Sequence, residues 1–260
     1  MTFSRRNFLK LTGLAGAGTL LGLKPAGDSL RILSADRSLS AATLSAFTDL
    51  TGASVAVAPP SFPGDAADCD LAIIPSHALT ALIQRGEIRE LSPISIPFPF
   101  EQRAYDPFNI FSLPAARGVV GINSRNAPPP VSWAEFFERA RTEPAHLPPH
   151  QTFRAALKSL GHSINTRASV ARAQARALVS ELESVPLARA RIALGESRPG
   201  WEFTLPAEGA ELWEDCFCVP VSAPHPELAR AFIQFALSAQ PLAPLPPLPL
   251  EPLSPFAPRA

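Results

Sequence analysis

The sequence predicts an α/β fold, because short apolar strand patterns alternate with amphipathic helix patterns along most of the chain. The clearest case is near the start, where residues 29–35 read as a strand, 39–52 as a helix and 54–58 as a second strand. A strand–helix–strand unit of this kind implies parallel strands with helices on the faces of the sheet. The chain of 260 residues is long enough for one large or two smaller lobes of this type.

The first half of the chain continues this alternation. In the first helix Leu44, Phe47 and Leu50 recur at helical spacing, and Gly52 stands where a C-terminal cap belongs. A continuous apolar run then predicts a strand over 69–76. A helix over 77–86 and a short edge strand over 87–91 follow it.

The second half begins after a proline-rich stretch, 92–114. Strands are expected at 118–123, 191–194, 201–206 and 216–221, and helices at 128–140, 151–160, 169–183 and 226–238. Ser132 with Glu135 forms a capping box at the start of the first of these helices. The tail, 241–260, carries eight prolines, which predicts a disordered segment without a helix or central strand.

The N-terminus carries an export signal. Residues 4–10 read SRRNFLK, which resembles the twin-arginine motif at every defined position, and an apolar run over 11–23 follows. A basic amphipathic helix is the alternative, but Arg5, Arg6 and Lys10 all precede the run and no acid occurs before Asp28. The pattern predicts a signal peptide over 1–26, a twin-arginine translocase as partner and a periplasmic protein. The run is shorter than the roughly 20 residues of a stable bilayer crossing, so only an uncleaved signal would leave a membrane tether.

Charge and cysteine content exclude several classes of function. Residues 1–26 hold four of the 23 basic residues and no acid, which leaves 19 basic and 23 acidic residues, a net charge of −4. This balance argues against nucleic acid as a partner. Cys69, Cys216 and Cys218 are too few for a disulfide framework, and no set of four metal ligands accompanies them, so buried, small apolar roles are expected. No metal or cofactor is predicted.

Two polar residues follow a predicted strand directly. Ser76 and His77 lie past the carboxyl end of the strand over 69–76, where α/β proteins bind ligands and where free backbone donors attract polar groups. A nucleophile–base pair is not indicated, because adjacent residues on a helix do not face each other and no Gly-x-Ser-x-Gly turn precedes them. The residues therefore predict binding and no enzymatic activity.

Four segments carry a resemblance to a known family. They are LRILSADRSLSAATLSAFTDLTGASVAV, CDLAIIPSHALTALIQRGEIREL, VSWAEFF with ALKSLGHSINT, and FTLPAEGAELWEDCFCVPVSAPHPELARAFIQFAL. Together they resemble the spermidine/putrescine-type solute-binding proteins of ABC importers. The resemblance implies a two-lobed type II periplasmic binding protein fold with a reduced second lobe. Lobe 1 would span 27–114 and 206–240, and lobe 2 would span 115–205.

The resemblance also implies a ligand site with an ABC permease as the partner. Trp213 and Asp215 stand where the family has a stacking tryptophan and an amine-binding aspartate, and Ser76 stands at a polar contact. An ordinary core role for Trp213 is the alternative, but its neighbours Glu211 and Glu214 are polar.

Other family positions have changed. Ser34 and Arg37 replace an aromatic pair, Ala78 replaces a tyrosine, Pro148 and Gln151 replace two carboxylates, and Glu196 is the acid that remains near a shortened stretch. The expected ligand set is therefore Trp213, Asp215, Ser76, His77, Arg37, Gln151 and Glu196. Such a set favours a small singly charged amine or a zwitterion over spermidine or putrescine. The alternative function is a degenerate binding-protein fold that has lost its solute and acts as a periplasmic protein-interaction module.

Overall fold

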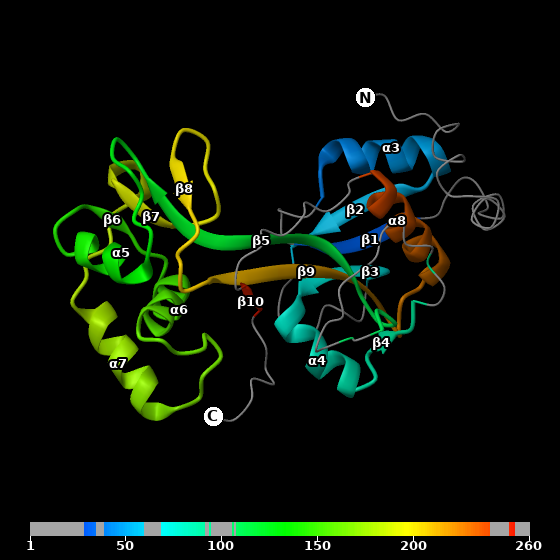
Figure 1. Cartoon of the computed structure of the whole chain (residues 1–260). Coiled ribbons are helices and arrows are strands. Elements are labelled where there is room, and N and C mark those ends of the chain that lie inside the picture. Colours follow the sequence, from blue (N-terminus) through cyan, green and yellow to red (C-terminus); the bar gives the residue numbers. More distant parts are fainter. Residues whose placement is uncertain are drawn as a thin grey trace. The chain divides into compact units, whose positions relative to one another are not determined.

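The computed structural model describes residues 29–34, 39–59, 69–91, 94, 106, 108–239 and 250–252. The signal segment and Arg37 lie outside these residues. The chain forms two compact units, of which unit 1 comprises Met1–Arg117 with Glu214–Ala243 and unit 2 comprises Gly118–Trp213 with Pro244–Ala260. The chain changes unit within two long strands, β5 (Leu113–Ser124) and β9 (Ala210–Pro220) (Figure 1). The sequence placed these boundaries at 114/115 and 205/206, which lie three residues before the change of unit in β5 and eight residues before the one in β9.

Unit 1 is a mixed sheet with helices on its faces. Its elements, besides its parts of β5 and β9, are β1 (Ser29–Ser34), α3 (Ala41–Thr51), β2 (Ser54–Ala58), β3 (Leu71–Pro75), α4 (Ser76–Gln84), β4 (Ile88–Arg89) and α8 (Pro226–Ala239). The strand order is β2-β1-β3-β9. β1 pairs in parallel with β2 and β3, whereas β9 runs antiparallel to β3 and also pairs with β4.

Alternation along the strands divides the core of unit 1 between the two faces of the sheet. Leu71 and Ile73 of β3 join a cluster with Phe47 of α3 and Phe232 of α8, and the two rings meet edge to face at 5.0 Å. Ala72 and Ile74 point the other way, into a cluster with Leu79 of α4 and with the cysteines. The caps of α3 are as predicted, since Ser40 accepts a bond from Thr43 N–H and Gly52 adopts φ +76°.

The predicted role of the cysteines is confirmed. Cys69, Cys216 and Cys218 are free and buried, and desolvation raises the pKa of the Cys218 thiol far above its ordinary value. The described residues contain no group of His, Cys, Asp and Glu side chains that could hold a metal ion. None of the helices in the described part of the chain combines the length and apolarity that a bilayer crossing requires.

Unit 2 is built on an antiparallel pair of strands with helices on one face. Its elements, besides its parts of β5 and β9, are α5 (Trp133–Ala140), β6 (Ala145–His146), α6 (Pro149–Ser159), α7 (Ser169–Ser180), η2 (Leu187–Arg189), β7 (Ile192–Gly195), β8 (Glu202–Thr204) and β10 (Leu250–Pro252). β5 pairs antiparallel with β7 and β8, and β6 lies parallel to β7. Helix α7 ends at Ser180, three residues before the predicted end.

The apolar residues of unit 2 face the three helices. Ile122 of β5 and Leu194 of β7 form a cluster with Trp133 and Phe136 of α5 and with apolar residues of α6 and α7. Gly121, Asn123 and Gly195 alternate with these residues and therefore belong to the opposite face of the strand pair. That face carries polar and glycine residues in place of a helix-covered core.

Two local details differ from the sequence prediction. Ser132 caps α5 by accepting from Glu135 N–H, but the Glu135 carboxylate accepts from the N–H of Val131, one residue before the capping-box partner. In addition, part of the proline-rich tail is ordered. β10 pairs in parallel with Ala210–Leu212 of β9. An edge position tolerates Pro252, since a proline there needs no ladder donor.

Candidate functional site

Trp213 is the expected aromatic contact, and it lies in unit 2 against the backbone of β5. A Cβ atom added at Gly118 would come within 2.7 Å of Trp213 Cζ2 and 2.8 Å of its Nε1, so only glycine leaves room for the ring. Trp213 is partly exposed, whereas its Nε1 atom is buried and has no hydrogen-bond acceptor in the described structure. The partly exposed indole, held against β5, therefore offers an aromatic face to a ligand.

The polarity next to Trp213, which argued against a core role for the tryptophan, is in part explained by an ion pair of Glu211. Glu211, two residues earlier on β9, is buried and accepts a 2.6 Å bond from Nε of Arg154 on α6. The polarity at this position thus reflects an ion pair within unit 2 and carries no information about a ligand.

Unit 1 brings three predicted residues together. In the antiparallel pairing of β3 and β9, Asp215 stands opposite Pro75, the residue before Ser76 and His77. Ser76 is buried and begins α4, His77 beside it is exposed, and Asp215 is partly exposed. No side-chain hydrogen bond caps α4 at Pro75, the residue paired with Asp215, so backbone N–H groups at the positive end of this helix begin one residue from that pair.

The remaining predicted residues are spread over different elements. Gln151 lies in the first turn of α6, and Pro148 is the N-cap residue of that helix. Glu196 follows β7 directly, and Ser34 is the buried last residue of β1. Neither Pro148 nor Gln151 carries a charge, so the start of α6 offers no carboxylate to a cationic ligand.

Sequence reasoning missed a second polar cluster in unit 2, formed by Asn123, Gly195 and Arg198. The Asn123 side chain is fully buried, donates to the carbonyl of Glu196 at 3.0 Å and accepts from the N–H of Arg198 at 3.2 Å. Gly195 has φ +140°, and a terminal guanidinium nitrogen of Arg198 would be 3.0 Å from a Cβ atom at this position. A glycine at a strand end with an arginine three residues later is the available sequence signal.

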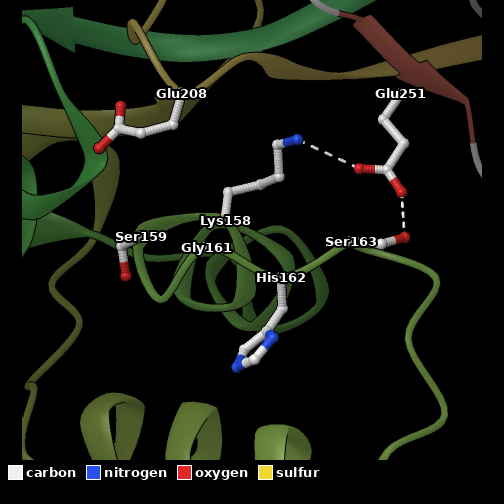
Figure 2. Close-up of a pocket in the computed structure, with 7 residues that line it drawn as sticks. All are labelled: Lys158, Ser159, Gly161, His162, Ser163, Glu208 and Glu251. Atoms are coloured by element: carbon white, nitrogen blue, oxygen red, sulfur yellow. Dashed lines mark hydrogen bonds and ion pairs between the residues drawn. The ribbon is translucent and has the colours of Figure 1, made fainter. Parts of the chain in front are cut away.

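A hollow of about 420 Å³ lies elsewhere in unit 2 (Figure 2). It is lined by Lys158, Ser159, Gly161, His162, Ser163, Glu208 and Glu251. None of the predicted ligand residues is among them. In Figure 2 the Lys158 side chain extends toward Glu251 of β10, and the His162 ring points away from that carboxylate.

Glu251 fixes the tail strand to this hollow. Its carboxylate accepts bonds from Lys158 at 3.2 Å, from Ser163 Oγ and from Asn165 Nδ2 at 3.3 Å. Burial acts to raise the pKa of Glu251, but the bonds from Ser163 and Lys158 outweigh it and hold the pKa below its ordinary value. The hollow is thus bordered by an internal ion pair that joins the tail to α6.

Comparison with known proteins agrees with the export signal. Residues 2–22 match the family described as the TAT (twin-arginine translocation) pathway signal sequence. The protein is accordingly periplasmic and is exported by the twin-arginine route, as predicted.

The rest of the chain is similar to solute-binding proteins. A putrescine/cadaverine-binding protein of Pseudomonas aeruginosa is 26% identical over 217 residues, which cover 66% of this chain and 61% of that protein. A crystal structure of a spermidine/putrescine ABC transporter substrate-binding protein from Streptococcus pneumoniae matches with a TM-score of 0.64 and 19% identity, over 81% of this chain and 78% of that one. A lipoprotein of Treponema pallidum matches with a TM-score of 0.68 and 20% identity, over 81% and 80%.

The chain has the type II periplasmic binding protein fold. The resemblance to the spermidine/putrescine type is also confirmed, because the curated relative is a putrescine/cadaverine-binding protein. The chain spans about three-fifths of the length of the curated relative it matches.

Proposed function

We propose that the protein is the extracytoplasmic solute-binding component of an ABC importer of the polyamine type, with a ligand other than spermidine or putrescine. The fold, the export signal and the similarity to a putrescine/cadaverine-binding protein support the first part. The observation that carries the proposal is the retention of Trp213 and Asp215. These two residues lie two apart on β9, so their side chains leave the same face of that strand.

These two residues supply the chemistry for one cationic end of a solute. An ammonium group over an aromatic face gains about 0.5 to 2 kcal/mol. A hydrogen bond to a charged group contributes roughly 1.5 to 3 kcal/mol. Together they suffice to orient an amine, although tight binding needs further contacts.

The second end of a long dication lacks such partners. Pro148 and Gln151 stand where the family has carboxylates, and they occupy the uncharged start of α6. Losing two charge-assisted bonds of about 1.5 to 3 kcal/mol each removes roughly three orders of magnitude in affinity, at about 1.4 kcal/mol per tenfold. Spermidine affinity is therefore expected to be no better than high micromolar.

Calorimetry on the exported protein tests this proposal with a panel of diamines, monoamines and amino acids. A ligand of the panel binds the native protein, and Trp213→Ala removes that binding. Trp201→Ala is the matched control, because Trp201 is also partly exposed but its ring stacks against Arg125 at 4.1 Å. Submicromolar spermidine binding contradicts the altered ligand, and a ligand indifferent to Trp213→Ala contradicts the site.

The second candidate is a fold that has lost its solute and serves as a periplasmic protein-interaction module. The replaced positions Ser34, Ala78, Pro148 and Gln151 favour it, because none of them offers an aromatic ring or a charge. A thermal-shift panel separates the two functions. A ligand at a hundredfold excess over its dissociation constant stabilises the folded state by about 2.7 kcal/mol, whereas a module without a solute shows no shift with any member.

A further inference from the structure

The first residues of β9, which belong to unit 2, have the tail strand as a neighbour. β3 and β4 pair with the residues of β9 from Asp215 onward. β10 pairs in parallel with the earlier residues, Ala210–Leu212, and lies off the main path of the sheet. Such a pairing uses main-chain donors and acceptors, which any extended segment can supply. This part of β9 is therefore suited to the addition of a strand.

The Glu251 side chain of β10 is held by a group of hydrogen-bond donors. Its carboxylate accepts bonds from Lys158 Nζ at 3.2 Å and from Asn165 Nδ2 at 3.3 Å. Ser163 Oγ and the backbone of Ile164 supply two further bonds. These four donor residues, which we call the carboxylate socket, lie at the end of α6 and in the loop that follows it. Bonds from a charged amine and several neutral donors favour an ionised carboxylate over a neutral side chain.

The socket also contacts the residue after the glutamate. Asn165 Nδ2 donates to the carbonyl oxygen of Pro252 at 2.8 Å as well as to Glu251, as the two hydrogens of an amide group allow. One side chain thus contacts both the acid and the main chain that follows it. Proline suits this position, because it loses no ladder bond at a sheet edge and its fixed φ is compatible with an extended chain. The ligand that matches these contacts is an extended segment in which Glu is followed by Pro.

The hollow beside Glu251 leaves room for a larger occupant than β10. Its volume is about 420 Å³, and Lys158 and Ser163 of the socket are among the residues that line it (Figure 2). The side chains of Lys158 and Glu251 are themselves partly exposed, at 15% and 23%. Because β10 has three residues, the bonds to Glu251 are a large part of what holds it. A short strand held mainly through one accessible side chain is suited to exchange with a competing segment.

We propose that unit 2 carries a peptide-binding site, formed by Ala210–Leu212 of β9 and the carboxylate socket, which the protein's own tail occupies as an internal competitor. The partner that fits is a protein with an extended Glu-Pro segment, which adds to β9 as a strand and places its glutamate in the socket. This inference goes beyond the solute-binding function and does not depend on it, because none of the predicted solute ligands lines the hollow.

A labelled peptide of the tail sequence, LPLEPLS (residues 248–254), tests the site by fluorescence anisotropy on the full exported protein. In the native protein the tail competes at an effective concentration in the millimolar range. Binding of a peptide with a dissociation constant of about 0.1 mM is then weakened about tenfold. Glu251→Gln removes the charge that seats the tail, so this variant binds the peptide about tenfold more tightly than the native protein does.

Changes in the socket and in the peptide make the result specific. Lys158→Met, introduced together with Glu251→Gln, weakens peptide binding about tenfold or more, because a charge-assisted bond is lost. The peptide LPLQPLS binds Glu251→Gln more weakly than LPLEPLS for the same reason. Glu183→Gln is the control, since Glu183 is an exposed acid of the same unit that does not line the hollow, and it leaves the affinity at the native value.

Two further measurements accompany the binding assay. Circular dichroism checks that each variant is folded. Hydrogen exchange locates the peptide, because its addition to Glu251→Gln raises the protection of the segment Ala210–Leu212 on β9.

Three results overturn the peptide site. One is equal affinity of the native protein and Glu251→Gln for the peptide, and another is the lack of peptide binding by folded Glu251→Gln. The third is displacement of the peptide by an equal concentration of free glutamate, because a site for free acids requires no strand. Each of these results leaves the solute-binding function standing, since its proposed residues lie outside this hollow.

Discussion

The contact between Gly118 and Trp213 predicts that Gly118→Ala changes the free energy of unfolding in opposite directions when the tryptophan is present and when it is removed. Gly118→Ala places a Cβ atom 2.7 to 2.8 Å from three atoms of the indole, while ordinary contacts begin at about 3.4 Å. The rigid ring must move by several tenths of an ångström, away from its place against β5. Overpacking of this kind destabilises a protein by about 1 to 3 kcal/mol.

The opposite effect is expected once the ring is gone. Gly118 has no positive φ, so alanine fits its backbone conformation. Replacing such a glycine stabilises the folded state by about 0.4 to 1 kcal/mol through the unfolded chain. Gly118→Ala therefore destabilises the native protein but is neutral or stabilising in a Trp213→Ala background.

Urea unfolding followed by far-ultraviolet circular dichroism measures all four members of this cycle, since the signal does not depend on the tryptophan removed. We expect a coupling free energy of about 1 to 3 kcal/mol between the two positions. Gly118→Ala also lowers the affinity for the panel ligand, because it displaces the indole face of Trp213 that would hold the amine. An equal effect of Gly118→Ala with and without Trp213 would show that the ring does not rest on β5, and the proposed site would lose its support.

Three other predictions concern the ion pairs and the export signal. Arg154→Met leaves the buried Glu211 carboxylate unpaired and lowers the free energy of unfolding in urea by about 3 kcal/mol. The double variant Arg154→Met with Glu211→Met recovers most of this loss. A double variant whose loss equals the sum of the two single losses contradicts the pairing. The depressed pKa of Glu251 means that its stabilising contribution is present above the ordinary value of 4.5 and is lost as the pH falls through the lower folded value. The protection of β10 amides against hydrogen exchange, relative to their intrinsic rates, therefore falls on acidification, and it is low at every pH in Glu251→Gln. Protection that is independent of pH contradicts the role of that carboxylate. Lysine at both Arg5 and Arg6 traps the protein in the cytoplasm, which cell fractionation detects, and normal periplasmic accumulation would disprove the signal.

The sequence by itself determined the features that depend on neighbouring residues. Ser40 and Gly52 bound α3 through bonds within one turn, so their types alone predict where that helix starts and ends. Alternation along β3 separates its two buried faces for the same local reason. The twin-arginine motif is read directly from seven consecutive residues and needs no fold at all.

The tertiary structure alone decided which distant side chains meet. The pairing of Arg154 with Glu211 joins residues 57 positions apart, and it explains a polar neighbour of Trp213 that the sequence had favoured as a sign of a ligand. Glu251 meets Ser163 across 88 positions, which orders three residues of a tail predicted to be disordered. Asn123 reaches Arg198 across 75 positions. Local pattern cannot supply these contacts, because strand pairing and helix packing bring the residues together only after the chain has folded.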